Sequence, residues 1–138
     1  MGSRRAAREF ALQMLYQWDL RRDNLDTSIA TFWEVNKAED DVRTFADRLV
    51  YGTVEHLEAL DPLIERHAKN WRLERMETLD RNLLRMATQE LLHEPDTPAT
   101  VVIDEAIEIA RRFSTLESPQ FINGLLDSIY KEIEERKS

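Results

Sequence analysis

An apolar side chain recurs every three or four residues along most of this sequence, and few residues interrupt the pattern. The first segment, residues 4–22, places Ala7, Phe10, Ala11, Met14, Leu15 and Trp18 on one face of a helix. Only 3 glycines and 4 prolines occur among the 138 residues, and both residue types disfavour helix interiors. The sequence therefore predicts an all-α fold rather than a sheet.

The same spacing predicts about seven helices in total. The six that follow the first are expected at about residues 26–35, 41–57, 61–68, 78–91, 98–113 and 118–133. Residues 70–77 are expected to form a connector with one helical turn at most. Since a chain of this length suits one domain, we expect a single domain, 1–138, in which the connector separates helical subdomains of about 1–70 and 71–138.

Charge is distributed unevenly along the chain. The net charge of −8 argues against general nucleic-acid binding, yet the first 22 residues are basic. They hold Arg4, Arg5, Arg8, Arg21 and Arg22 against Glu9 and Asp19. Because local charge decides whether a phosphate backbone can dock, the first helix stays a candidate nucleic-acid surface.

Several classes of protein are disfavoured by what the sequence lacks. Without cysteine, disulfides and thiolate catalysis are excluded. No apolar run approaches the roughly 20 residues that span a bilayer, and no signal peptide opens the chain. We therefore expect a cytoplasmic protein without membrane association.

The sequence gives no sign of catalysis, a metal or a cofactor. The three histidines, His56, His67 and His93, have no metal-ligand spacing, and neither a phosphate-binding glycine loop nor a nucleophile elbow occurs. We therefore expect a protein that is not an enzyme. One carboxylate is unusual, because Glu90 falls within the apolar stripe of its helix. An unpaired buried carboxylate is costly, so Glu90 is expected to pair with an arginine or a helix end.

Arg5, Arg8 and Tyr16 share one side of the first helix. Arginine can contact phosphates, and an aromatic ring can stack on an unpaired base. The pattern alone favours the plainer interpretation, which is a solvent-exposed charged face with Tyr16 at the edge of the core.

The stretch "SPQFINGLLD", residues 118–127, combines a helix start with an unusual pair inside the helix. Ser118 is expected to cap this helix and Pro119 to occupy its first position. Phe121 and Gly124 lie together on the side away from the apolar stripe, where they make a shallow notch. Close packing of another helix and contact with an external partner explain this notch equally well.

Four segments of the chain resemble the NusB family of bacterial transcription antitermination factors. They are "SRRAAREFALQMLYQWDL", "LDRNLLRMATQELL", "DTPATVVIDEAIEIARRF" and "SPQFINGLLD", and they occur in the family's order. The resemblance covers nearly the whole chain and is weakest over residues 23–70. It implies an all-α fold of two three-helix bundles packed in one compact domain, without enzymatic chemistry.

The resemblance also implies a function and a set of partners. It predicts an adaptor that binds boxA, a single-stranded RNA element of ribosomal RNA operons, together with NusE, a small-subunit ribosomal protein. The pair then joins NusA, NusG and RNA polymerase, and termination is suppressed. Some members of the family self-associate, so a homodimer is also considered. The alternative is a module of the same fold that serves protein interaction or oligomerisation without specific RNA binding.

Carried onto matching positions, the resemblance assigns residues to two partners. For the RNA they are Arg4, Arg5, Arg8, Gln13, Tyr16, Arg85, Ser118, Gln120 and Phe121. For NusE they are Asp80 and Arg81, while Arg85 is placed to touch either partner. Gln120 stands where a lysine can occur in the family, which weakens a phosphate contact there. On this basis Arg8→Glu is expected to weaken boxA binding without unfolding the protein, and Asp80→Lys to loosen NusE more than RNA.

Overall fold

The computed structural model describes residues 3–69 and 71–137, and the secondary structure in these ranges is helical throughout. The helices are α1 (Ser3–Arg21), α2 (Leu25–Val35), α3 (Asp40–Glu55), α4 (Leu57–Ala68), the short 3₁₀ helix η1 (Leu73–Arg75), α5 (Thr78–His93), α6 (Ala99–Phe113) and α7 (Ser118–Lys137). The predicted all-α fold of about seven helices is thereby confirmed.

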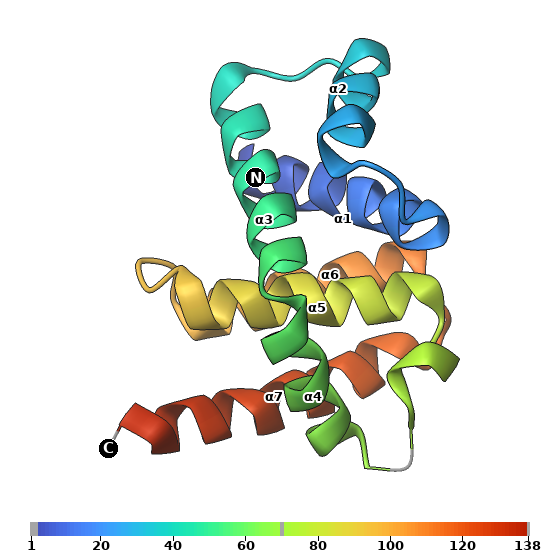
Figure 1. Cartoon of the computed structure of the whole chain (residues 1–138). Helices are drawn as coiled ribbons and strands as arrows, with labels where there is room; N and C mark the ends of the chain where they lie inside the picture. Colours follow the sequence, from blue (N-terminus) through green and yellow to red (C-terminus); the bar gives the residue numbers. More distant parts are fainter. Residues whose placement is uncertain (1–2, 70, 138) are drawn as a thin grey trace.

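Helix α5 is the centre of the fold (Figure 1). It packs against α1 and α3 of the N-terminal half and against α6 and α7 of the C-terminal half, while α4 contacts both α5 and α7. Helix α2 packs on α1, and Trp33 of α2 donates a hydrogen bond from Nε1 to Asp47 of α3 at 2.8 Å. The helices thus form two bundles, α1–α3 and α5–α7, with α4 lying across the second.

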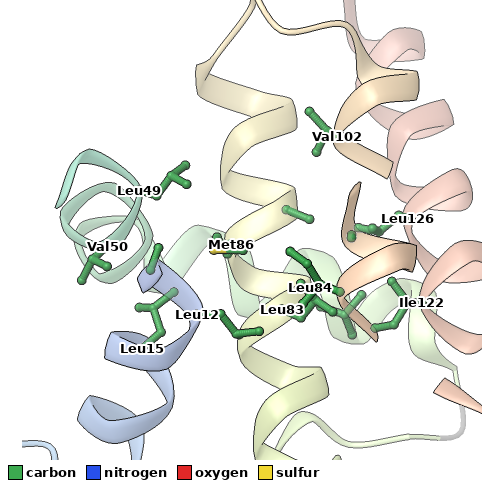
Figure 2. Packing of buried hydrophobic residues seen from close by; sticks show 14 of the residues in the cluster. Leu12, Leu15, Leu49, Val50, Leu83, Leu84, Met86, Val102, Ile122 and Leu126 are labelled. Carbon is green, nitrogen blue, oxygen red and sulfur yellow. The ribbon is translucent and has the colours of Figure 1, made fainter. Parts of the chain in front are cut away.

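One apolar core joins the two bundles (Figure 2). Leu12, Leu15, Leu49 and Val50 lie on one side of α5, and Val102, Ile122 and Leu126 lie on the other. Helix α5 itself contributes Leu83, Leu84 and Met86, each of which is buried. Because burial of apolar surface is the main driving force for folding, neither bundle completes its core without α5.

Helix α4 begins earlier than the sequence predicted. The expected start was residue 61, with Pro62 at the first helical position, whereas α4 begins at Leu57 and contains Pro62. His56, with φ −103° and ψ 17°, lies between α3 and α4 and interrupts the helical conformation there. Leu60 is fully buried, so the first turn of the helix removes a large apolar side chain from solvent. That burial offsets the single backbone hydrogen bond that the proline ring forgoes.

Other helix starts differ from the prediction by a residue or two. The second helix was expected from about residue 26, whereas α2 begins at Leu25 after Asn24, whose side chain accepts a hydrogen bond from the backbone N–H of Thr27 at 2.9 Å. Thr78 is the first residue of α5 and follows Glu77, which makes no side-chain cap. Residues 71–77, the part of the connector that the structure describes, hold a single helical turn, η1, as predicted.

The described helices also limit the kinds of site that the chain can carry. None of them combines the length and the apolar character that crossing a membrane requires. Within residues 3–69 and 71–137, no group of three potential ligands is placed to hold a metal ion.

Candidate nucleic-acid interface

Helices α1 and α6 run in the same direction and are joined by two ion pairs. Near the start of α1, the Nε and Nη2 atoms of Arg5 each donate to the carboxylate of Glu105 at 2.8 Å. One turn further along, Glu9 accepts a hydrogen bond from Arg112 at 2.6 Å. Residues 5–16 of α1 span about 16 Å at the rise of a helix. Their far end lies beside the end of α6 and the α6–α7 turn, residues 114–117, on the right of Figure 1.

Two predicted RNA contacts lie at the N-terminal end of this pair of helices. Arg4 is exposed, and its guanidinium carbon lies 3.8 Å from the centre of the Phe45 ring. Arg5 keeps 33% of its side-chain surface exposed despite its pairing with Glu105. Hydrogen bonds from Arg5 lower the pKa of Glu105, so the pair stays ionised. We call Arg4, Arg5, Gln13 and Tyr16 the α1 strip.

Arg8 does not belong to the α1 strip, which corrects the sequence-based assignment. Its side chain is buried, and its Nε and Nη2 atoms donate to Glu90 at 2.9 Å and 2.5 Å. Only 5% of the Arg8 side chain and 1% of the Glu90 side chain are exposed. A phosphate cannot reach Arg8 unless this pair breaks, because the helix turns Arg8 toward α5. The expectation that Glu90 pairs with an arginine is confirmed.

Gln13 and Tyr16 lie at the other end of the α1 strip and are both exposed. They border a cavity of about 350 Å³ between α1, the start of α5 and the end of α6, with Leu12, Leu79 and Phe113 in its lining. Tyr16 is 38% exposed and Phe113 is 49% exposed. The cavity is therefore an open, apolar groove with an aromatic ring on each side.

Asp80 and Ser118 lie inside the protein, and this position corrects both assignments. The carboxylate of Asp80 accepts hydrogen bonds from the hydroxyl groups of Ser114 at 2.7 Å and Ser118 at 2.6 Å. Asp80 is 6% exposed and Ser118 is 2% exposed. The Ser118 hydroxyl is therefore used to tie α7 to α5, and neither side chain presents a polar group to a partner. Together the three side chains fix the α6–α7 turn against α5.

Arg81 and Arg85 are likewise occupied by internal partners. Arg85 donates to both carboxylate oxygens of Asp61, at 2.8 Å and 2.9 Å, and to Asp19 at 3.0 Å. Arg81 donates to Asp19 at 2.8 Å and to the backbone carbonyl of Leu73 in η1 at 3.3 Å. Arg85 is buried, and 14% of the Arg81 side chain is exposed. The predicted contacts of these arginines with RNA or NusE would compete with this network.

Asp19 is the acceptor at the centre of that network. Burial alone opposes the ionisation of its carboxyl group, but hydrogen bonds from Arg22, Asn82 and Arg81, with the charge of Arg85, outweigh burial and lower its pKa to about 2. Asp19 thus stays negatively charged at neutral pH. It links the end of α1 to the first turns of α5.

Phe121 and Gln120 remain on the surface at the start of α7. Gln120 is exposed, and Phe121 is partly buried against the core. The ring of Phe121 meets the ring of Trp71 edge to face, with centroids 6.2 Å apart and planes at 68°. Trp71 is 54% exposed. Sequence reasoning missed Trp71, although a tryptophan between Lys69 and Arg72 in a connector is itself a signal.

The notch beside Gly124 is not filled by another helix. A Cβ atom added at Gly124 would meet no atom within 4 Å, and Gly124 is exposed. Gly52 of α3 differs, because an added Cβ would lie 2.5 Å from the side-chain nitrogen of Gln89. The sequence left two explanations of the notch, packing of another helix and contact with an external partner. Within the part of the chain that the structure describes, the first is excluded at Gly124.

Comparison with known proteins identifies the family to which this chain is similar. The NusB family model matches residues 5–131. The "Transcription antitermination protein NusB" of Koribacter versatilis is 51% identical over 138 residues, covering 99% of this chain and 94% of that protein. Among solved structures, NusB of T. maritima is 39% identical with a TM-score of 0.86, covering 98% of this chain and 97% of the other.

A second solved structure contains partners. It is described as antitermination factors NusB and NusE in complex with double-stranded RNA. Its matching chain is 30% identical to this one with a TM-score of 0.86, and the match covers 94% of this chain and 97% of the other.

Proposed function

The chain belongs to the NusB family, and on that premise we propose that it is a transcription antitermination factor that binds RNA together with NusE. Such a role is regulatory and not enzymatic. The observation that carries the RNA-binding part is the parallel course of α1 and α6, which two ion pairs join, because it leads the α1 strip to the groove at the end of α6. We place its action in the cytoplasm, where bacterial RNA polymerase works.

We propose boxA of ribosomal RNA operons as the RNA. Arg4 and Arg5 would contact phosphates at the start of the α1 strip, because both keep exposed guanidinium surface. Gln13 and Tyr16 would meet bases at its other end, and Gln120 with Phe121 would continue the path onto α7. Stacking and phosphate neutralisation together suit unpaired RNA. The chain as a whole carries a net charge of −8, so its acidic surface outside this path would repel RNA and confine it there.

In this proposal the buried residues do not touch the RNA or NusE. They position the helices that form the binding surface. Arg8 sets α1 against α5, whereas Asp80 and Ser118 set the start of α7. Arg81 and Arg85 fix the end of α1 and the connector. Their substitution would therefore disturb both partners through the shape of the surface.

The apolar groove beside Tyr16 supports a protein contact. Tyr16 and Phe113 both line this groove and keep large parts of their surface exposed there. Exposed apolar groups gathered in one place mark interaction surfaces. We propose that NusE covers this groove and that NusA, NusG and RNA polymerase join through the NusE-bound complex. There are two alternatives. A second copy of this chain could cover the groove, or the protein could be a module that binds only other proteins and no specific RNA.

The test is a titration of a boxA oligonucleotide and a scrambled control, each with and without NusE. We expect boxA to bind more tightly than the control, and NusE to tighten boxA by the same factor by which boxA tightens NusE. Equal affinity for the two oligonucleotides, combined with retained NusE binding, would select the protein-interaction alternative.

Salt provides a second readout of the same complex. Each phosphate contact adds roughly 0.7 to the slope of log affinity against log salt for a single strand. Arg4→Ala should therefore reduce that slope by about this amount. Lys37→Ala is the matched control, because Lys37 is an exposed cation in the α2–α3 loop, away from the α1 strip. A slope that is unchanged by Arg4→Ala would remove Arg4 from the interface.

A further inference from the structure

The connector and the start of α7 enclose a second cavity, of about 340 Å³. Trp71 and Phe121 form its aromatic side, and Arg75 lies in the same lining. Trp71 turns about half of its surface to solvent, whereas Trp18 and Trp33 are buried, at 8% and 9% exposure. Trp71 is therefore the exposed tryptophan of the chain, and its ring is held in place by a partner ring on α7.

Three basic residues lie close to Trp71 in the sequence, although Arg75 alone among the described cations lines the cavity itself. Lys69, Arg72 and Arg75 are all exposed. Among the described residues, their one acidic neighbour within ion-pair distance is Glu74, which lies 3.7 Å from Arg72 with both side chains largely in solvent. Ion pairs of that kind contribute little. Three cations with little internal pairing thus flank an exposed indole ring on an otherwise acidic protein.

The rim of the cavity offers hydrogen-bond acceptors. Glu77 and Glu117 both line it and are exposed, and neither has a hydrogen-bond partner among the described side chains. The carboxylate of Asp80, deeper in the same lining, is already engaged by Ser114 and Ser118. A group with an aromatic face and N–H donors on its edge could stack on Trp71 and donate hydrogen bonds to Glu77 or Glu117 at the same time.

We propose that this cavity, the Trp71 cleft, holds one unpaired nucleobase of the bound RNA. The base stacks on the face of Trp71 beside Phe121, its N–H edge donates to Glu77 or Glu117, and Arg72 and Arg75 contact the adjoining phosphates. Proteins bind single strands by this combination of stacking and phosphate neutralisation. The inference rests on the proposed RNA-binding function and extends the RNA path from α7 onto the connector.

The cleft predicts a preference among bases as well as binding. Guanine, adenine and cytosine carry an exocyclic amino group, whereas uracil offers one ring N–H. Carboxylate acceptors at the rim therefore favour a base with an amino group in the cleft. Glu77→Gln with Glu117→Gln should weaken this preference, because an amide can still accept a hydrogen bond but loses the charge.

The experiment tests whether the effect of changing Trp71 depends on one particular base of the RNA. A boxA oligonucleotide and a set of variants, each with one abasic position, are titrated into the full chain with NusE present. Wild type should lose roughly five- to a hundred-fold in affinity at the position that occupies the cleft. Trp71→Ala should lose a similar factor on intact RNA and lose nothing further at that one abasic position. Trp71→Phe should restore most of the affinity, because a phenyl ring still stacks.

Controls separate this inference from the proposed function and from a folding defect. Tyr51→Ala removes another exposed aromatic ring, on α3, and should leave the abasic profile unchanged. The melting temperature of Trp71→Ala reports on its folding. If wild type prefers boxA over a scrambled RNA while Trp71→Ala binds boxA equally well, the cleft proposal fails and the proposed function stands. Loss of NusE affinity without RNA in Trp71→Ala would identify NusE, and not a nucleobase, as the occupant of the cleft, and would also overturn the proposal.

Discussion

Arg8 of α1 and Glu90 of α5 form a bidentate ion pair that is almost completely buried, with donor–acceptor distances of 2.9 Å and 2.5 Å. The pair lies between the two bundles, at the centre of the packing that involves α1, α3 and α5. It converts a residue that looks like a phosphate contact in the sequence into a structural anchor. Its energetic role differs accordingly.

We expect Arg8→Ala to lower the free energy of unfolding by about 3–5 kcal/mol, because it leaves the carboxylate of Glu90 buried without a partner. The double variant Arg8→Met with Glu90→Leu should recover most of that loss, since apolar residues of similar volume can replace a buried pair. Urea unfolding of the wild type and of the two variants measures both effects. A loss below about 0.5 kcal/mol for Arg8→Ala, the size of a surface effect, would contradict the anchoring role.

Asp80 should act through the α6–α7 turn. Asp80→Ala removes the acceptor of two hydroxyl groups, one of which is the buried Ser118 hydroxyl. An unsatisfied buried donor costs about 1–3 kcal/mol, so urea unfolding should show a loss of that size. Asp80→Asn retains an acceptor oxygen and should cost less. We also expect Asp80→Lys to weaken RNA and NusE together, and a selective loss of NusE in separate titrations would restore the original assignment.

Asp19 should make the protein sensitive to acid. Its pKa in the folded protein is about 2, below the ordinary value of 3.8, so the folded state favours the ionised form. The resulting stability, about 2 kcal/mol, is present above pH 4 and is lost as the pH falls toward 2. Urea unfolding between pH 6 and pH 2.5 should show Asp19→Asn less stable at the upper end. The difference from wild type should shrink at the lower end, and a constant difference would exclude Asp19 as its source.

Gly124 and Gly52 give a matched pair of substitutions. Gly124→Ala adds a methyl group to open space in a helix interior, so we expect a gain of about 0.5–1 kcal/mol. Gly52→Ala forces the buried Gln89 side chain to move, and overpacking costs about 1–3 kcal/mol. Thermal unfolding separates the two signs. If Gly124→Ala is more stable and binds RNA less well, the glycine serves ligand approach, and unchanged RNA affinity would remove that role.

The helices could be predicted from the sequence because their apolar spacing repeats over long segments, as in α1 and α5. The partner of Glu90 could be predicted as a class, since a carboxylate within an apolar stripe requires a cation or a helix end. The identity of that partner could not, because Arg8 lies 82 residues away. The early start of α4 was missed for a related reason. The burial of Leu60 depends on tertiary contacts that local capping signals do not contain.

The candidate site was predictable in its residue types and less so in their exposure. Arg5 and Arg8 look alike in the sequence, yet one keeps a third of its side chain in solvent and the other is buried. Their three-residue separation turns them toward different neighbours, α6 and α5. Trp71 was missed because a connector has no periodicity from which a face can be read. The edge-to-face contact with Phe121 exists only after α7 returns to the connector.

The distance in sequence between Arg8 and Glu90 also bears on how the chain is made. Glu90 follows Arg8 by 82 residues, and a segment of that length takes roughly 4–16 s to synthesise at about 5–20 residues per second. During that time α1 to α4 emerge from the ribosome with their inner apolar surface uncovered and with Arg8 lacking its carboxylate. Completion of the first bundle therefore waits for translation of α5, and this interval is when the nascent chain most needs protection from aggregation.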